Sequence, residues 1–208
     1  MLGHALSGDA LSAFLIAVSF AAGLNVYATV ATLGLLARAG LLTLPGELAP
    51  LAQWCVIGGC GVLFVIEFIA DKIPVFDLIW NALQTFVRVP VAALLAYGAT
   101  HQLEPAWQLT AAIGGGVIAL AAHGGKTAAR AAVTLSPEPF SNFALSVAED
   151  AFTIFITWFS TRHPFLAAAI VVVLLVVIVV LIRWILRALT SLLRFAFQKT
   201  LEPTASRG

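Results

Sequence analysis

The stretch PFLAAAIVVVLLVVIVVLI, from Pro164 to Ile182, contains no charged residue and is apolar on every side of a helix. A helix needs about 20 apolar residues to cross the hydrocarbon core of a bilayer, so this stretch predicts a membrane-spanning helix that faces lipid. The whole chain has the same character, because 61% of its 208 residues are hydrophobic and only 10% are charged. Too few polar residues remain to cover a soluble core, and we expect an integral membrane protein.

Five further apolar segments predict additional spans, so we expect an all-α, polytopic membrane protein with about six membrane segments. The six segments are residues 11–37, 51–70, 73–100, 107–122, 142–161 and 164–182. They form one transmembrane domain over residues 1–190. Residues 183–208 carry basic residues among apolar ones, and we expect them to form an amphipathic tail helix along the inner surface of the membrane.

The third segment, Ile73–Thr100, is the least regular of the six. A polar stripe at helical spacing runs along its first half and consists of Asp77, Asn81, Gln84 and Arg88. Pro90 follows, and a proline removes one backbone hydrogen bond from a helix. We therefore expect a helix that is broken near Pro90. Its first half is either re-entrant, with its polar side against protein or water, or amphipathic and lying on the membrane surface.

A short internal similarity favours a repeat. An Arg-x-Pro sequence at residues 88–90 and again at residues 162–164 precedes an alanine-rich span. Each copy follows a segment that contains a buried carboxylate, Glu67 or Glu149. The chain is therefore a candidate for a 3+3 inverted repeat of the kind found in secondary transporters.

Charged residues in or against the predicted spans are the best guide to function. An ionised side chain at the bilayer centre is unfavourable by at least about 2.5–3.5 kcal/mol, so such residues persist where they pair, line water or do chemistry. We expect these residues, with the polar residues on the same helix faces, to form one interior site. The candidate site residues are Asn25, Tyr27, Glu67, Asp71, Lys72, Asp77, Asn81, Gln84, Arg88, His123, Lys126, Arg130, Asn142, Glu149 and Asp150.

Three interpretations of this site remain open. In the first, its buried carboxylates exchange protons or cations, and the chain is a small transporter or channel. In the second, Arg88, Lys126 and Arg130 bind an anionic lipid headgroup or a phosphate. In the third, the charges are ion pairs that only fix the register of the helices. The expected partners are the lipid bilayer and a proton, an ion or a small polar or anionic solute, and a homo-oligomer is possible.

Other functions are disfavoured. The formal net charge is +1, so bulk electrostatics do not indicate nucleic-acid binding. The His123-Gly-Gly-Lys126 turn lacks the Gly-x4-Gly-Lys spacing of a phosphate-binding loop. An acid–base pair of His123 with Glu149 or Asp150 is the strongest catalytic interpretation, but a lone histidine at a membrane boundary is more often a hydrogen-bonding residue. We expect no enzyme and no cofactor, and the sequence identifies no metal.

The chain resembles the bacterial membrane-protein family called Domain of Unknown Function 4126. The motifs that carry the resemblance are Gly23-Leu-Asn25-Val-Tyr27, Glu67-Phe-Ile-Ala-Asp71-Lys72-Ile-Pro74, His123-Gly-Gly-Lys126, Ser136-Pro-Glu-Pro-Phe-Ser-Asn142 and Glu149-Asp150. The resemblance implies a multi-pass protein of the bacterial inner membrane. Basic residues concentrate on the cytoplasmic side of such proteins, so the basic tail and an even number of spans predict that both termini are cytoplasmic.

Overall fold

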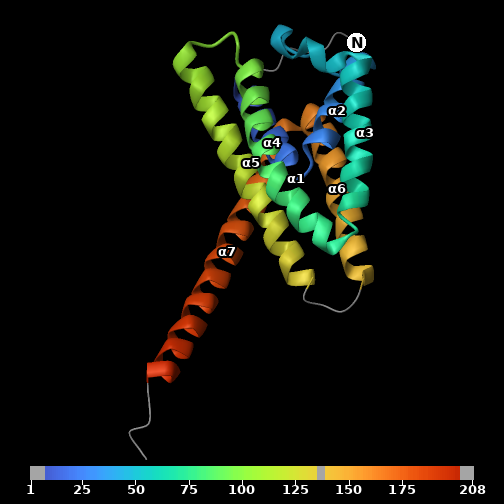
Figure 1. Cartoon of the computed structure of the whole chain (residues 1–208). Coiled ribbons are helices and arrows are strands. Elements are labelled where there is room, and N and C mark those ends of the chain that lie inside the picture. Colours follow the sequence, from blue (N-terminus) through green and yellow to red (C-terminus); the bar gives the residue numbers. More distant parts are fainter. Residues whose placement is uncertain (1–7, 135–138, 202–208) are drawn as a thin grey trace, which may run out of the picture.

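The computed structural model describes residues 8–134 and 139–201, and every regular element in these two ranges is helical. The elements, in chain order, are α1 (Gly8–Leu24), α2 (Val26–Arg38), the 3-10 helix η1 (Gly46–Ala52), α3 (Trp54–Ala70), α4 (Pro74–Ala99), α5 (Pro105–Thr134), α6 (Pro139–Arg162) and α7 (Pro164–Leu201). α1 lies at the centre, where it contacts α2, α4, α5, α6 and α7 (Figure 1).

Within the described ranges, four helices are long and apolar enough to cross a membrane, by length and composition. These spans lie in α4, α5, α6 and α7, and η1 with α3 forms a fifth candidate that is bent by 63°. On α7, Val173 and Val180 are 61% and 58% exposed, as expected for side chains that face lipid rather than protein. The all-α membrane fold class predicted from the sequence is confirmed.

The first apolar segment differs from its prediction, because residues 11–37 form two helices instead of one span. Asn25 separates α1 from α2 with an extended backbone, at φ −152° and ψ 102°. Gly8 at the start of α1 lines the same cavity as Thr43, a few residues beyond α2. The two helices have 17 and 13 residues, fewer than the about 20 that a spanning helix typically needs. They form a hairpin with Asn25 at its tip, which we call the α1–α2 hairpin.

The path of the hairpin is fixed by its neighbours. Gly23, at the end of α1, approaches α5 so closely that a Cβ atom there would lie 2.7 Å from Ala119 Cα. Near the end of α2, a Cβ atom on Gly34 would lie 2.8 Å from Ile57, in the first turn of α3. Arg38 closes this end by donating a hydrogen bond of 3.0 Å to the carbonyl of Ala52. The hairpin therefore returns to the end of the bundle at which α3 begins.

Three further predictions differ from the structure. α4 continues through Pro90 without a break, as membrane helices allow when neighbouring helices satisfy the freed backbone groups. The predicted turn at His123–Lys126 is helical instead, because α5 extends to Thr134. α7 continues as one helix to Leu201 and leaves the bundle, where a separate surface tail was predicted (Figure 1).

The start of α1 and the end of α7 lie at opposite ends of the structure (Figure 1). The hairpin is not the single span predicted for residues 11–37, and the placement of both termini on the cytoplasmic side stays a prediction. The predicted inverted repeat stays a prediction.

Candidate functional site

The end of α3 provides two buried carboxylates. Glu67 and Asp71 are four residues apart, so they lie on one face of the helix, and both are fully buried. This face turns toward the middle of α4 and the second half of α5. Burial of two carboxylates is unfavourable unless cations and hydrogen-bond donors surround them.

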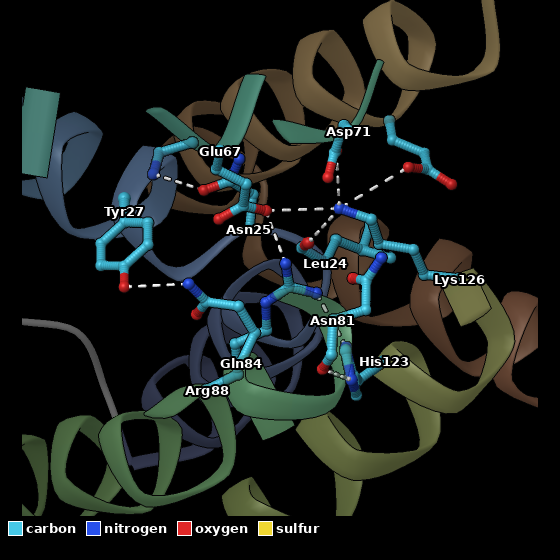
Figure 2. A network of polar contacts seen from close by, with 12 residues as sticks. Leu24, Asn25, Tyr27, Glu67, Asp71, Asn81, Gln84, Arg88, His123 and Lys126 are labelled. Atoms are coloured by element: carbon cyan, nitrogen blue, oxygen red, sulfur yellow. Dashed lines mark hydrogen bonds and ion pairs between the residues drawn. The ribbon is translucent and has the colours of Figure 1, made fainter. Parts of the chain in front are cut away.

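Arg88 supplies the first of these cations from the middle of α4, and its side chain is also fully buried. Its guanidinium contacts Glu67 Oε1 at 2.5 Å and donates to Nδ1 of His123 at 2.7 Å. It also donates to the carbonyl of Gly23 at 3.3 Å, which belongs to the last turn of α1. One arginine thus connects α3, α5 and the hairpin tip, and its contact with Glu67 is visible in Figure 2.

Lys126 on α5 occupies the middle of the cluster (Figure 2). Its ammonium group lies 3.3 Å from Glu67 Oε1, 3.3 Å from Asp71 Oδ2 and 3.7 Å from Glu149 Oε2. It also donates to the carbonyl of Leu24 at 3.2 Å. Carbonyls at a helix C-terminus carry partial negative charge, so the end of α1 favours this cation.

Arg130, one turn further along α5, completes the ion pairs. It contacts Asp71 Oδ2 at 2.6 Å and Glu149 Oε2 at 2.7 Å. Its Nε also donates to Glu149 at 3.2 Å, so one guanidinium holds α6 against the end of α3. Such charge-assisted bonds are stronger than neutral ones and fix geometry.

The hairpin tip enters this cluster through Asn25. Its side-chain oxygen accepts a hydrogen bond of 3.0 Å from the backbone N–H of Ala28 and so caps the start of α2. Its side-chain nitrogen donates to Asp150 Oδ1 on α6 at 2.9 Å. Asn25 and Asp150 are both at least 96% buried, with exposures of 1% and 4%. The tip is therefore held by Arg88, Lys126 and Asp150 together.

Among the described side chains of this cluster, acidic groups exceed basic ones. Glu67, Asp71, Glu149 and Asp150 face Arg88, Lys126 and Arg130. Each of the three cations contacts at least one carboxylate, whereas the described partner of Asp150 is the neutral Asn25. Within the described part of the chain, Asp150 Oδ2, Glu67 Oε2 and Gln84 Oε1 are buried oxygens without a hydrogen-bond partner. The cluster thus retains acceptor capacity, and Lys72 in the neighbouring turn, which lies within electrostatic reach of Asp71 and Asp150, makes the described acidic and basic groups equal in number.

The chain matches a known family over most of its length. Residues 13–184 match the family described as "Domain of unknown function (DUF4126)". The chain belongs to this family. No match is found among curated proteins or among solved structures. The family description states no function, and the resemblance predicted from the motifs is confirmed.

In this DUF4126 protein, most of the predicted site residues lie in one connected region. Tyr27 reaches it through its hydroxyl, which accepts a bond of 3.1 Å from Gln84. Asn81 reaches it through its backbone carbonyl, which lies 3.1 Å from Nε2 of His123. Two predicted residues lie outside the described side chains, namely Asp77 and Asn142.

Lys72 lies apart from the ion pairs, in the turn between α3 and α4. Its ammonium group donates to the carbonyl of Phe68 at 2.7 Å and lies over the ring of the same residue. Desolvation lowers the pKa of Lys72 from its ordinary value, while the negative charges of Asp150 and Asp71 act in the opposite direction. Lys72 is therefore a neighbour of the cluster at the end of the bundle.

Sequence reasoning missed the main-chain part of the site. The carbonyls of Gly23 and Leu24 receive bonds from Arg88 and Lys126 only because α1 ends there. A signal was present, since asparagine is a preferred N-cap residue and follows Gly23-Leu24 directly. The role of Thr85, which contacts Nε2 of His123 at 2.8 Å, was also missed.

Proposed function

We propose that this DUF4126 protein is a small membrane transporter or channel in which buried carboxylates exchange protons or cations. The observation that carries the proposal is a buried carboxylate, Asp150, which has no ion pair among the described residues and contacts the tip of a broken helical hairpin. A broken helix places backbone carbonyls and side chains in the interior of a membrane protein, and ion sites of transporters use this arrangement. An uncompensated carboxylate in such an interior favours the uptake of a positive charge.

The binding of an anionic headgroup or phosphate is the weaker alternative. Arg88, Lys126 and Arg130 would have to supply the positive charge, and each already contacts a carboxylate. A phosphate would have to displace these carboxylates from a buried position, against charge-assisted hydrogen bonds. The carboxylates that already pair with these three cations therefore disfavour an anionic ligand.

A purely structural role explains the ion pairs of Arg130 but not the rest of the cluster. Ion pairs that only fix helix register need no buried carboxylate outside the ion pairs, and a buried oxygen without a partner is unfavourable by about 1–3 kcal/mol. The position of Asp150 supports a proton or another cation as the ligand.

We further propose a location in the bacterial inner membrane with the C-terminal half of α7 on the cytoplasmic side. Arg183 and Arg187 follow the apolar part of α7, and basic residues favour that side. The α1–α2 hairpin is then re-entrant from the opposite side, with Asn25 inside the bilayer. Native mass spectrometry measures whether copies of the chain associate.

Reconstitution in liposomes tests the proposed transport. The purified chain is inserted into vesicles that contain a pH-sensitive dye, and a pH gradient is imposed while potassium and valinomycin clamp the voltage. We expect faster acidification of the lumen than in protein-free vesicles. Opposing gradients of Na⁺ or K⁺ then identify a cation that competes with protons. Vesicles that acidify no faster than protein-free ones under any of these gradients would refute the proposal.

The lipid alternative gives a different result in a parallel experiment. If the cations bind a headgroup, native mass spectrometry detects an anionic lipid on the wild-type protein that Arg88→Ala and Lys126→Ala both lose. Under our proposal no such specific lipid is detected, and the flux experiment gives the positive signal.

A further inference from the structure

Asp150 differs from the other carboxylates of the cluster in how it is neutralised. Glu67, Asp71 and Glu149 each contact one or more cations within 3.7 Å. Asp150 has no such ion pair among the described residues, although it is 96% buried, at 4% exposure. Its only described hydrogen bond comes from the amide of Asn25, and its second oxygen has no partner.

Charged groups of both signs lie near Asp150, at distances longer than those of an ion pair. α6 packs against α1, α2, α5 and α7. The charged groups within electrostatic reach of Asp150 are Lys126 on α5, Glu67 and Asp71 at the end of α3, and Lys72 in the turn that follows. Glu149 precedes it on its own helix, and α7 carries no charged residue before Arg183. Repulsion by Glu67 and Asp71 thus acts on Asp150 together with attraction by Lys126 and Lys72.

Asn25 transmits the state of Asp150 to the hairpin. The same side chain that donates to Asp150 accepts the N–H of Ala28, and its main-chain oxygen accepts from both the N–H and the hydroxyl of Thr29. These bonds form the first turn of α2. A change at Asp150 therefore acts directly on the residue that joins the two helices of the hairpin.

We propose that Asp150 is the group that takes up and releases the proton, and that its protonation loosens the tip of the α1–α2 hairpin through Asn25. This inference rests on the proposed function and names its coupling residue. A proton from the aqueous phase binds Oδ2, which has no partner, so the bond to Asn25 need not break first. The carboxylate becomes a neutral acid, and Oδ1 becomes a weaker acceptor for the Asn25 amide. Deprotonation restores the charge-assisted bond and the closed tip.

Glu67, Asp71 and Glu149 keep their ion pairs, and so the positions of their helices, while Asp150 is protonated. Each is fixed by Arg88, Lys126 or Arg130, and protonating one of them would leave a buried cation without its partner. The division of roles is therefore between three paired carboxylates that position the helices and one unpaired carboxylate that titrates.

Hydrogen–deuterium exchange of the reconstituted full chain tests this inference without any transported solute. The readout is the exchange rate of a peptide covering residues 26–33, corrected for the intrinsic effect of pH. We expect slow exchange at high pH and faster exchange at low pH in the wild type. Asp150→Asn keeps the shape of the side chain but mimics the neutral acid. It should exchange about tenfold faster at high pH, the change expected when a hydrogen bond to a charged group becomes one between neutral groups.

Two controls make the outcome decisive. A peptide from residues 165–175 of α7 reports on the bundle and should exchange equally in both proteins. Asn25→Ala removes the connection, so its residues 26–33 should exchange fast at every pH. Equal, pH-independent exchange of residues 26–33 in wild type and Asp150→Asn would overturn the inference.

The same data separate this inference from the proposed function. If the exchange of residues 26–33 depends on pH but no proton or cation flux is measured, the switch is supported and the transport function is refuted. If flux is measured but the exchange of residues 26–33 does not depend on pH, the transport function is supported and the role of Asp150 is refuted.

Discussion

Arg88 donates a hydrogen bond of 2.7 Å to Nδ1 of His123, and both side chains are at least 96% buried, with exposures of 0% and 4%. An arginine has no acceptor atom and stays charged, so Nδ1 of His123 must carry a lone pair rather than a proton. The proton then lies on Nε2, which is within 3.1 Å of the carbonyl of Asn81. His123 is thus a neutral bridge that orients Arg88 toward Glu67.

We predict that His123 is a neutral Nε2–H imidazole at neutral pH. Nitrogen NMR of the ¹⁵N-histidine-labelled protein distinguishes a protonated from an unprotonated ring nitrogen, and the His123→Gln variant assigns the signal. His101 and His163, at the ends of helices, serve as internal comparisons. A His123 signal with both nitrogens protonated at neutral pH would contradict the bond from Arg88.

Gly23 lies where the hairpin tip meets α5. A methyl group there would lie 2.7 Å from Ala119 Cα and 2.8 Å from Ala122 Cβ, so the backbone must move. We predict that Gly23→Ala destabilises the protein by about 1–3 kcal/mol, in the range of overpacked cores. Thermal unfolding in detergent measures the effect.

Gly58→Ala is the matched control for this substitution, because it adds the same methyl group in an apolar helix. A Cβ atom on Gly58 has nothing within 4 Å, so this variant should unfold like the wild type. Equal stability of the Gly23→Ala and wild-type proteins would show that the tip does not pack against α5 as described.

Glu67 is the carboxylate that holds both Arg88 and Lys126. Glu67→Gln removes the negative charge and leaves two buried cations with fewer partners, so we predict a loss of about 3–5 kcal/mol. The double variant Glu67→Leu with Arg88→Met removes the pair together and should recover part of this loss. Glu47→Gln, on the exposed 3-10 helix, is the control. A Glu67→Gln protein as stable as this control would contradict the ion pairing.

Helical periodicity explains why part of the charged site could be predicted. Residues three and four apart share a face, so the spacing of Glu67 and Asp71 predicted that they lie together. The same spacing brings His123, Lys126 and Arg130 together in the structure, because α5 continues through the turn that was predicted at His123–Lys126. Because the rest of the bundle is apolar, these polar faces are buried against one another.

The hairpin could not be predicted from the same information. An apolar run of a given length can form either one long span or two short helices that fold back on each other. Residues 11–37 are compatible with both structures. In the structure the hydroxyl of Thr29 donates to the carbonyl of Asn25, so these two residues form the start of α2. The opposite error occurred at Pro90, where neighbouring helices allow α4 to continue.

Cysteine labelling tests the hairpin directly. In a chain whose Cys55 and Cys60 are replaced, single cysteines at Asp9 and Thr43 should react with a membrane-impermeant reagent from the same side. A cysteine at Arg187 should react from the other side. All three positions are exposed in the structure. Reaction of Asp9 and Arg187 from one side, with Thr43 on the other, would restore a single span over residues 11–37.

The most direct test of the account is the initial rate of proton flux into dye-loaded proteoliposomes that contain the wild type, Asp150→Asn or Glu47→Gln. All three should insert to the same extent, since Asp150 forms no ion pair with the described residues and Glu47 is exposed. The account predicts equal flux for the wild type and Glu47→Gln, and for Asp150→Asn a rate no higher than that of protein-free vesicles. Undiminished flux in the Asp150→Asn vesicles would contradict it.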